Sequence, residues 1–205
     1  MNEEFDLIPT PEDPETPNEV ISQDDPQKPS VFASVFDIIE TLALYFAVAI
    51  VILITLFTHS PVDGTSMVPT LEPNDLLIVR RLGYSPQNGD IIVCQSPTYG
   101  LNKPLVKRVI ATEGQRVVID YKNWTVTVDG VTLDEDYINR IPGADMLSSY
   151  LGEEFTVPEN HIFVMGDNRN GSVDSRSEHV GFIDERYVVG KVALRLMPIN
   201  KFELF

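Results

Sequence analysis

Cysteine, histidine and positive charge are all scarce in this chain of 205 residues, and each scarcity excludes a class of protein. Cys94 is the only cysteine, so an intrachain disulfide is impossible, and its place after three apolar residues predicts a buried thiol at a strand end. The three histidines stand apart, and neither HExxH nor CxxC occurs, so we expect no metal site and no cofactor. The net charge of -16 argues against binding to nucleic acid or to anionic lipid.

Acidic residues and prolines concentrate in residues 1–30. This segment contains nine acidic residues, six prolines and a single cation, Lys28. Such a composition cannot bury enough apolar surface to offset the entropy lost on ordering. We therefore predict a disordered acidic N-terminal tail.

One long apolar run follows the tail. Residues 41–57 carry no charge, and together with residues 31–40 they could form a helix of about 25 residues, long enough to cross a bilayer core of about 30 Å. The run is apolar on every face, unlike a helix at the surface of a soluble protein. It is too long, too far along the chain and too poor in preceding basic residues for a cleavable signal peptide. We predict one transmembrane anchor over residues 31–58, whose orientation the few flanking cations leave open.

Short apolar strands separated by turns make up the rest of the chain. Asn88-Gly89 is typical of a hairpin turn between the first two of them. The pattern predicts a mostly β, antiparallel, barrel-like or folded-sheet domain over residues 59–205, while residues 138–151 could hold a short helix or a loop. The strands are expected at residues 75–81, 90–94, 104–111, 116–121, 125–129, 153–157, 161–165 and 188–194, with 195–197 as a further short one.

Ser66 lies in a stiff, irregular turn soon after the apolar run. Gly64 can adopt a positive φ, while Pro69 fixes its own φ and makes Val68 extended. Taken alone, this segment is equally typical of an ordinary Ser/Thr-rich turn. It is not the G-x-S-x-G turn of many hydrolases, because Val68 replaces the second glycine. Composition does not exclude a Ser-His-Asp triad, but nothing ties a histidine to Ser66.

Lys107 and Arg108 are neighbours on one expected strand, so their side chains point to opposite faces and one of them meets the buried face. An arginine would stay charged there, whereas a lysine can release its proton when burial lowers its pKa. A neutral amine can accept the proton of a serine hydroxyl. On the strand alone, a lysine that reaches out to water is the commoner case.

A dense polar turn over residues 165–176 is the third notable segment. Asp167, Arg169, Asp174 and Arg176 can form ion pairs there, and Ser172 can donate or accept a hydrogen bond. A solvated loop has the same kind of composition.

Together, these segments resemble the conserved boxes of the bacterial type I signal peptidases, membrane-bound serine proteases with a Ser-Lys dyad. The matching motifs are residues 64–71, 107–109 and 166–176, in the order found in the family. The resemblance implies that Ser66 is the nucleophile, Lys107 the general base and Ser172 the hydroxyl that orients the lysine amine. The reaction implied is removal of N-terminal signal peptides from exported pre-proteins after Ala-x-Ala-like junctions.

The resemblance also assigns supporting roles. Met67 and Pro69 would lie near the scissile bond, and a small cap would occupy residues around 115–160 of the catalytic domain. Some members carry a serine two residues before the nucleophile as an oxyanion donor; Gly64 stands there, so the Ser66 backbone N–H and another backbone donor would have to serve. The residues that would hold the site by ion pairing are Arg108, Asp167, Asp174 and Arg176.

The implied location is the bacterial plasma membrane, with the N-terminus cytoplasmic and the catalytic domain outside. The implied partners are signal peptides, the lipid bilayer and the export translocon. Two alternatives remain: a self-cleaving Ser-Lys repressor, although the chain has an apolar span and no Ala-Gly or Cys-Gly bond, and a membrane-anchored extracellular peptide-binding or scaffolding β domain without catalysis.

Overall fold

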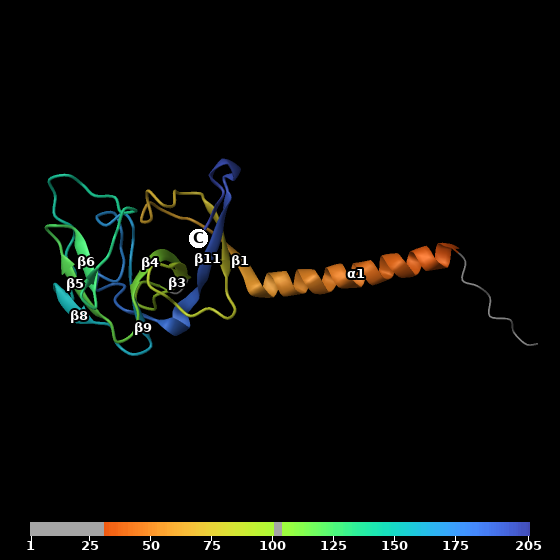
Figure 1. The fold of residues 1–205 in the computed structure, drawn as a ribbon, viewed down its shortest axis with the longest axis horizontal. Coiled ribbons are helices and arrows are strands. Elements are labelled where there is room, and N and C mark those ends of the chain that lie inside the picture. Colours follow the sequence, from red (N-terminus) through yellow and green to blue (C-terminus); the bar gives the residue numbers. More distant parts are fainter. Residues whose placement is uncertain (1–30, 101–103) are drawn as a thin grey trace, which may run out of the picture. The chain divides into compact units, whose positions relative to one another are not determined.

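The computed structural model describes residues 31–100 and 104–205 (Figure 1). The predicted acidic tail over residues 1–30 lies outside the described residues. The chain divides into two units between Tyr45 and Phe46.

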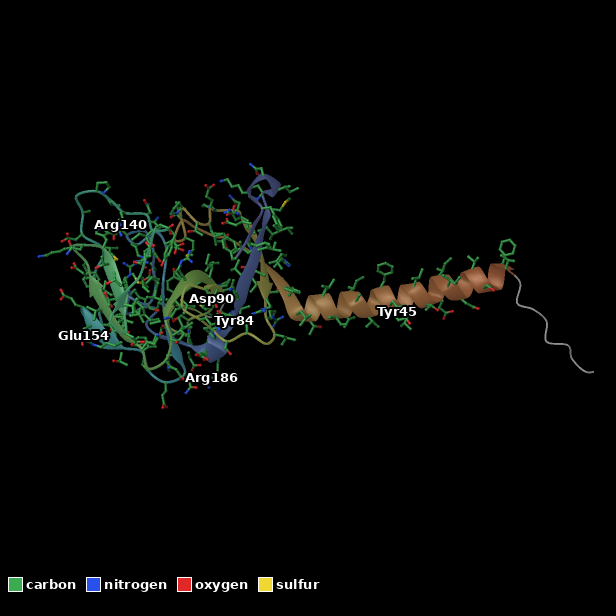
Figure 2. The ribbon with its side chains drawn as sticks, viewed as in Figure 1. Tyr45, Tyr84, Asp90, Arg140, Glu154 and Arg186 are labelled. Carbon is green, nitrogen blue, oxygen red and sulfur yellow. The ribbon has the colours of Figure 1, made fainter. Side chains whose placement is uncertain are left out.

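Helix α1 (Val31–Leu56) is apolar over most of its length, and its charged residues, Asp37 and Glu40, lie in its first half. The side chains along it are almost entirely hydrocarbon, as Figure 2 shows, and nearly all of those described are exposed. Its two threonines donate their hydroxyls to carbonyl oxygens four residues earlier, at 2.7 Å each, so the helix satisfies these polar groups itself. Residues 34–56 are long and apolar enough to cross a membrane.

The helix ends at Leu56 because the next residues enter a β-sheet. Phe57 and Thr58, which the sequence placed in the anchor, begin strand β1 and lie opposite Arg80 and Val79. Strand β1 therefore follows α1 along the chain without a connecting segment.

The larger sheet has eight antiparallel strands in the order β1-β2-β11-β3-β4-β9-β10, with β12 paired to β11. Its middle strands, β3 and β4, are buried almost throughout. The prediction of a mostly β antiparallel fold is confirmed. The strands are β1 (Phe57–Pro61), β2 (Leu76–Arg80), β3 (Ile91–Cys94), β4 (Leu105–Ala111), β9 (His161–Met165), β10 (Ile183–Asp184), β11 (Val188–Met197) and β12 (Glu203–Leu204).

The predicted hairpin at Asn88-Gly89 is wrong. Strand β11, from the far end of the chain, lies between β2 and β3 and pairs with both. The Gly89 N–H donates to the Val109 carbonyl at 2.8 Å instead of closing a two-strand ladder. A long apolar strand that pairs with two neighbouring strands buries more surface than a local hairpin. The local sequence around Asn88-Gly89 does not reveal this pairing. Residues 188–197 accordingly form one strand and not two.

A smaller sheet, of order β7-β6-β5-β8, lies at one end of the β domain (Figure 1). The predicted pairing of residues 116–121 with 125–129 is confirmed by β5 and β6. Residues 138–151 form turns, without the short helix that was considered. The sheet falls within the expected cap around residues 115–160, whose boundaries stay a prediction. Its strands are β5 (Arg116–Asp120), β6 (Thr125–Val128), β7 (Val131–Thr132) and β8 (Glu154–Thr156).

Strand β4 is packed on both faces. Leu105 and Val109 belong to one cluster of buried residues, while Val106 and Ile110 belong to two others. Every residue of this strand except Arg108 is buried. Short 3-10 turns at Glu185–Tyr187 and Ile199–Lys201 complete the described elements.

Candidate active site

Residues 62–75 form a closed loop, here called the Ser66 loop. The Val62 N–H donates to the Asp75 carbonyl at 2.9 Å, which joins the two ends of the loop. Met67 and Leu71 are at most 1% exposed and pack into the core beneath it. Ser66 is thus carried by an irregular segment that is held both at its ends and from below.

The flanking residues of this loop adopt special conformations. Gly64 has a φ of +89°, which a residue with a side chain would adopt only under strain. Pro69 is exposed, whereas the Met67 side chain is not. The apolar side chain of Met67 is buried under the loop and supports it, and its expected place near the scissile bond stays a prediction.

Lys107, in the middle of β4, points at Ser66. Its amine Nζ is hydrogen-bonded to Ser66 Oγ at 2.8 Å and donates to the Val106 carbonyl at 3.1 Å. The residue is 3% exposed. Burial lowers the pKa of Lys107 below the ordinary lysine value, against the opposing pull of the Asp174 charge. The structure thus brings together a serine hydroxyl and a lysine that releases its proton readily.

The turn after β9 presses against the Ser66 backbone. The Asn168 N–H donates to the Ser66 carbonyl at 3.0 Å, and the Asn168 side-chain amide donates to the Thr65 carbonyl at 3.1 Å. A Cβ atom on Gly166 would lie 2.5 Å from the Ser66 carbonyl oxygen and 2.3 Å from Ser172 Oγ. Only glycine permits this approach. Gly166 and Asn168 lie within the motif of residues 166–176, but the sequence did not predict that they position the Ser66 backbone.

Ser172 Oγ is buried and makes no hydrogen bond of ordinary geometry within the described residues. The two bonds of the Lys107 amine go to Ser66 and Val106, so the predicted role of Ser172 in orienting the lysine stays a prediction. A buried hydroxyl without a partner is costly, and such groups are usually found at functional positions or next to an ordered water.

Two forked ion pairs lie beside the serine and lysine, one between β4 and the turn after β9 and one within that turn. Arg108 donates to both Asp167 oxygens, at 2.9 and 2.7 Å, and Arg176 donates to both Asp174 oxygens, at 2.9 and 2.8 Å. Burial alone would raise the pKa of Asp174, but the hydrogen bonds and charge of Arg176 hold it below the ordinary value. Thr70 Oγ1 also donates to Asp167, so this carboxylate links the strand of Lys107 to the Ser66 loop.

Arg169 pairs differently from the expectation. It lies 0% exposed against Glu135 rather than against Asp167 or Asp174, with Nη1 donating to Glu135 Oε2 at 3.0 Å. The Arg169 carbonyl in turn accepts from Arg176 at 2.6 Å. Glu135 precedes this turn by 34 residues in a segment without regular structure, so no periodicity in the sequence could have identified it.

Replacing Glu135 by alanine should lower the free energy of unfolding by about 3–5 kcal/mol, because a buried guanidinium loses its counter-charge. Urea unfolding of the full chain in mild detergent measures the change. The matched control is Glu154→Ala, which breaks an ion pair whose side chains are 58% and 55% exposed and should cost less than about 1 kcal/mol. Equal effects from the two substitutions would contradict the importance of the buried pair.

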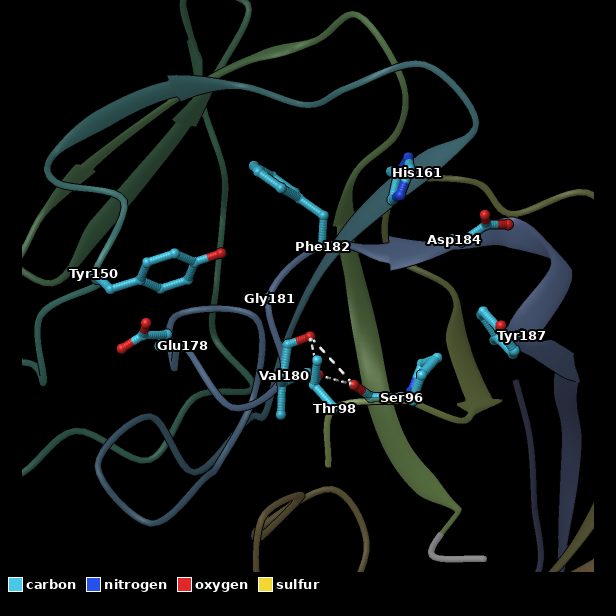
Figure 3. A pocket seen from close by; sticks show the side chains of 11 residues that line it. Ser96, Thr98, Tyr150, His161, Glu178, Val180, Gly181, Phe182, Asp184 and Tyr187 are labelled. Carbon is cyan, nitrogen blue, oxygen red and sulfur yellow. Dashed lines mark hydrogen bonds between the residues drawn. The ribbon is translucent and has the colours of Figure 1, made fainter. Parts of the chain in front are cut away.

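A hollow of about 420 Å³ opens beside β10 (Figure 3). None of Ser66, Lys107 and Ser172 lines it. The hydroxyls of Ser96 and Thr98 on its wall already donate to the Val180 carbonyl. The hollow is therefore separate from the serine and lysine. Its lining residues are Ser96, Pro97, Thr98, Tyr150, His161, Glu178, Val180, Gly181, Phe182, Asp184 and Tyr187.

Other chemistries find little support among residues 31–100 and 104–205. Cys94 is fully buried, as predicted, and burial raises the pKa of its thiol to about 12, which makes it a poor nucleophile. No group of three or more histidine, cysteine, aspartate or glutamate side chains in these residues could hold a metal ion. No hydrogen bond in them joins a histidine to Ser66, which disfavours a Ser-His-Asp triad.

Comparison with known families gives one match, to a family described as signal peptidase, peptidase S26, over residues 35–197. That range covers α1, the Ser66 loop, β4 and the turn after β9.

Two relatives found by sequence, from Synechocystis and Bacillus caldolyticus, agree with this match. A probable signal peptidase I-1 of Synechocystis is 37% identical over 171 residues, which cover 78% of this chain and 82% of the relative. A signal peptidase I of Bacillus caldolyticus is 38% identical over 171 residues, covering 77% and 90%. A crystal structure of a signal peptidase I from Enterococcus faecalis, 32% identical, covers 53% of this chain and 97% of its own, with a TM-score of 0.45.

Proposed function

The chain belongs to the signal peptidase family S26 and is a serine peptidase that removes signal peptides, and we propose that Ser66 is its nucleophile and Lys107 its general base. The observation that carries this proposal is the 2.8 Å contact between Ser66 Oγ and the buried Lys107 amine. A hydroxyl becomes a nucleophile when a base within hydrogen-bond reach accepts its proton.

The reaction follows from this pair. Neutral Lys107 accepts the hydroxyl proton as Ser66 Oγ attacks the carbonyl carbon of the scissile peptide bond. The resulting ammonium donates that proton to the nitrogen of the mature protein, the C–N bond breaks, and an ester to Ser66 remains. Lys107, again neutral, then takes a proton from water as the water oxygen attacks the ester carbon. The ester C–O bond breaks, Lys107 returns that proton to Ser66 Oγ, and the signal peptide leaves with a new carboxyl group.

The oxyanion formed during attack needs hydrogen-bond donors. Gly64 has no side-chain donor, and no heavy atom lies within 4 Å of where its Cβ would be, so the backbone there is open to a close approach. The Ser66 N–H and a second backbone N–H of the same turn are the donors we assign. A single such donor contributes about 3–4 kcal/mol to stabilisation of the transition state.

The apolar helix makes this a membrane-anchored peptidase. The orientation we assign has the tail in the cytoplasm and the β domain outside, where exported pre-proteins emerge from the translocon. Anchoring confines the enzyme to the bilayer in which its substrates are also held, which raises their effective concentration. We expect the substrates to have small side chains at the first and third positions before the cut, as in Ala-x-Ala-like junctions.

The pH dependence of cleavage tests the proposal. The value of kcat/KM should rise with pH, because only the neutral amine is a base. It should reach its plateau at a pH below the ordinary lysine pKa, because burial lowers the pKa of Lys107. The measurement is cleavage of a purified pre-protein with an Ala-x-Ala junction by the full chain in detergent, from pH 6 to 10. A pre-protein with leucine at both alanine positions is the substrate control and should resist cleavage.

The same pKa shift predicts how stability varies with pH. Between the lowered pKa of folded Lys107 and the ordinary lysine pKa, the unfolded chain holds a proton that the folded chain has released. The contribution of Lys107 to the free energy of unfolding therefore increases with pH across that interval and is smallest below it.

For the cleavage assay, a rate that is constant or falls from pH 6 to 10 would contradict the assignment of lysine as the base.

A further inference from the structure

Arg195, near the end of β11, joins the Ser66 loop to the C-terminus of the chain. Its Nη1 donates to the Thr70 carbonyl at 2.9 Å and to Asp75 Oδ2 at 3.0 Å, and both acceptors belong to the Ser66 loop. Its Nε donates to the Lys201 carbonyl at 2.7 Å, and its Nη2 donates to Glu203 Oε2 at 2.6 Å. The last two acceptors belong to residues 194–205, here called the C-terminal hairpin, in which β12 pairs with the end of β11.

Further contacts connect the same two segments. Lys201 forms an ion pair with Glu72 of the loop at 2.7 Å. Phe205, whose N–H donates to the Ala193 carbonyl at 3.0 Å, packs against the core cluster that holds Met67 and Leu71. The hairpin therefore contacts the loop through charge, hydrogen bonds and apolar packing.

Thr70 is held from two directions. Its hydroxyl donates to Asp167, which Arg108 holds beside Lys107, and its carbonyl accepts from Arg195. Thr70 is four residues after Ser66, and the Leu71 N–H donates to the Met67 carbonyl at 2.9 Å across the intervening turn. A displacement at Thr70 is thus transmitted to the nucleophile through a short, hydrogen-bonded stretch. Misplacing a reacting group by about 1 Å can cost about 100-fold in rate.

We propose that the C-terminal hairpin braces the catalytic loop and that Arg195 is a positioning residue for Ser66. This inference rests on the proposed role of Ser66 as the nucleophile. Arg195 is 8% exposed, and its planar guanidinium reaches four acceptors in fixed directions. A lysine keeps the charge beside Asp75 and Glu203 but cannot reproduce that fork.

The test is Arg195→Lys in the full chain in detergent, with a pre-protein that has an Ala-x-Ala junction. We expect kcat to fall by about 10- to 100-fold, KM to stay within about threefold because the residue does not touch substrate, and the midpoint of the pH profile to stay at the wild-type value. Active sites are counted by titration with a peptide boronate that ends in an alanine analogue. A positioning role predicts the full wild-type number of titratable sites, each working more slowly.

Two control variants show whether the loss of kcat is specific to Arg195. Glu203→Gln leaves the bonds to Thr70 and Asp75 in place, so its kcat should stay within about threefold of wild type. Arg186→Lys makes the same chemical change in an ion pair whose arginine side chain is 82% exposed, and should cleave like wild type. If Arg195→Lys does not fold, the combined Asp75→Asn, Arg195→Gln and Glu203→Gln variant, which leaves no unpaired charge, should fold and show the same loss of kcat.

The inference is overturned if Arg195→Lys or the combined variant cleaves with the wild-type kcat. It is also overturned if the lost rate equals the lost fraction of titratable sites, since that result describes misfolding alone. The assay separates this outcome from failure of the proposed function, in which Ser66→Ala would cleave as well as wild type.

Discussion

Ser66→Ala should abolish cleavage at the Ala-x-Ala junction, with kcat lowered by about 10⁶-fold, the scale found when the nucleophile of a serine protease is removed. The fold should survive, because the change removes one half-buried hydroxyl, and the loop stays attached through the Val62–Asp75 bond and the buried Met67 and Leu71. The Lys107 amine keeps its bond to the Val106 carbonyl. Cleavage is measured with purified protein in detergent, and unfolding in urea provides the measure of folding.

The matched control for this variant is Ser85→Ala, which alters an exposed serine on the turn before β3. It should cleave at the wild-type rate. Comparable cleavage by Ser66→Ala and the wild type would mean that another residue is the nucleophile, or that a contaminating protease is responsible. Loss of cleavage in both serine variants would indicate that general damage to the fold, and not the nucleophile, accounts for the result.

Lys107→Met should have the second largest effect, with kcat lowered by about 10⁴-fold or more, since one amine acts as base towards Ser66 and as acid towards the leaving nitrogen. Methionine has a similar length and suits the apolar surroundings of β4. Stability should be unchanged or higher than in the wild type, because the cost of burying an amine disappears. A variant that is at least as stable and yet inactive separates a catalytic role from a structural one.

The control is Lys122→Met, which removes an exposed lysine from the turn between β5 and β6 and should leave cleavage unchanged. Residual activity of Lys107→Met should also lose the rise with pH that the wild type shows. Full activity in Lys107→Met, or an unchanged pH profile, would transfer the role of base to another group.

Much of the β domain could be predicted, because most of its strands have a recognisable pattern in their own residues. The ranges 105–111, 161–165 and the pair 116–120 with 125–128 follow from runs of apolar and β-branched residues between turn residues. The hairpin at Asn88-Gly89 could not be judged in this way. The insertion of β11 between β2 and β3 depends on a partner about a hundred residues further along, which no local pattern contains.

The candidate site shows the same division. The sequence singled out Ser66, Lys107 and the turn that holds Asp167 and Asp174, from chemistry and from motifs. It did not find Glu135, Thr70, Asn168 or Arg195 as supports, because each acts through contacts with a segment distant along the chain. Arg169 was expected to pair within its own turn, where Asp167 and Asp174 were available. Arg108 and Arg176 occupy those carboxylates with forked bonds, so Arg169 pairs with Glu135 instead.

By itself the sequence determined which kinds of elements the protein contains. Composition, hydrophobic periodicity and the backbone restrictions of glycine and proline can all be read from neighbouring residues. They specify an apolar helix, a β domain and three chemically distinctive segments. Tertiary structure alone decided how closely the Lys107 amine approaches Ser66 Oγ and how deeply it is buried, because β4 lies between two neighbouring strands and is packed on both faces. It also decided which carboxylate each arginine receives and what supports the Ser66 loop. Those outcomes depend on distances between segments that are remote in sequence, where burial, geometry and charge must be satisfied together.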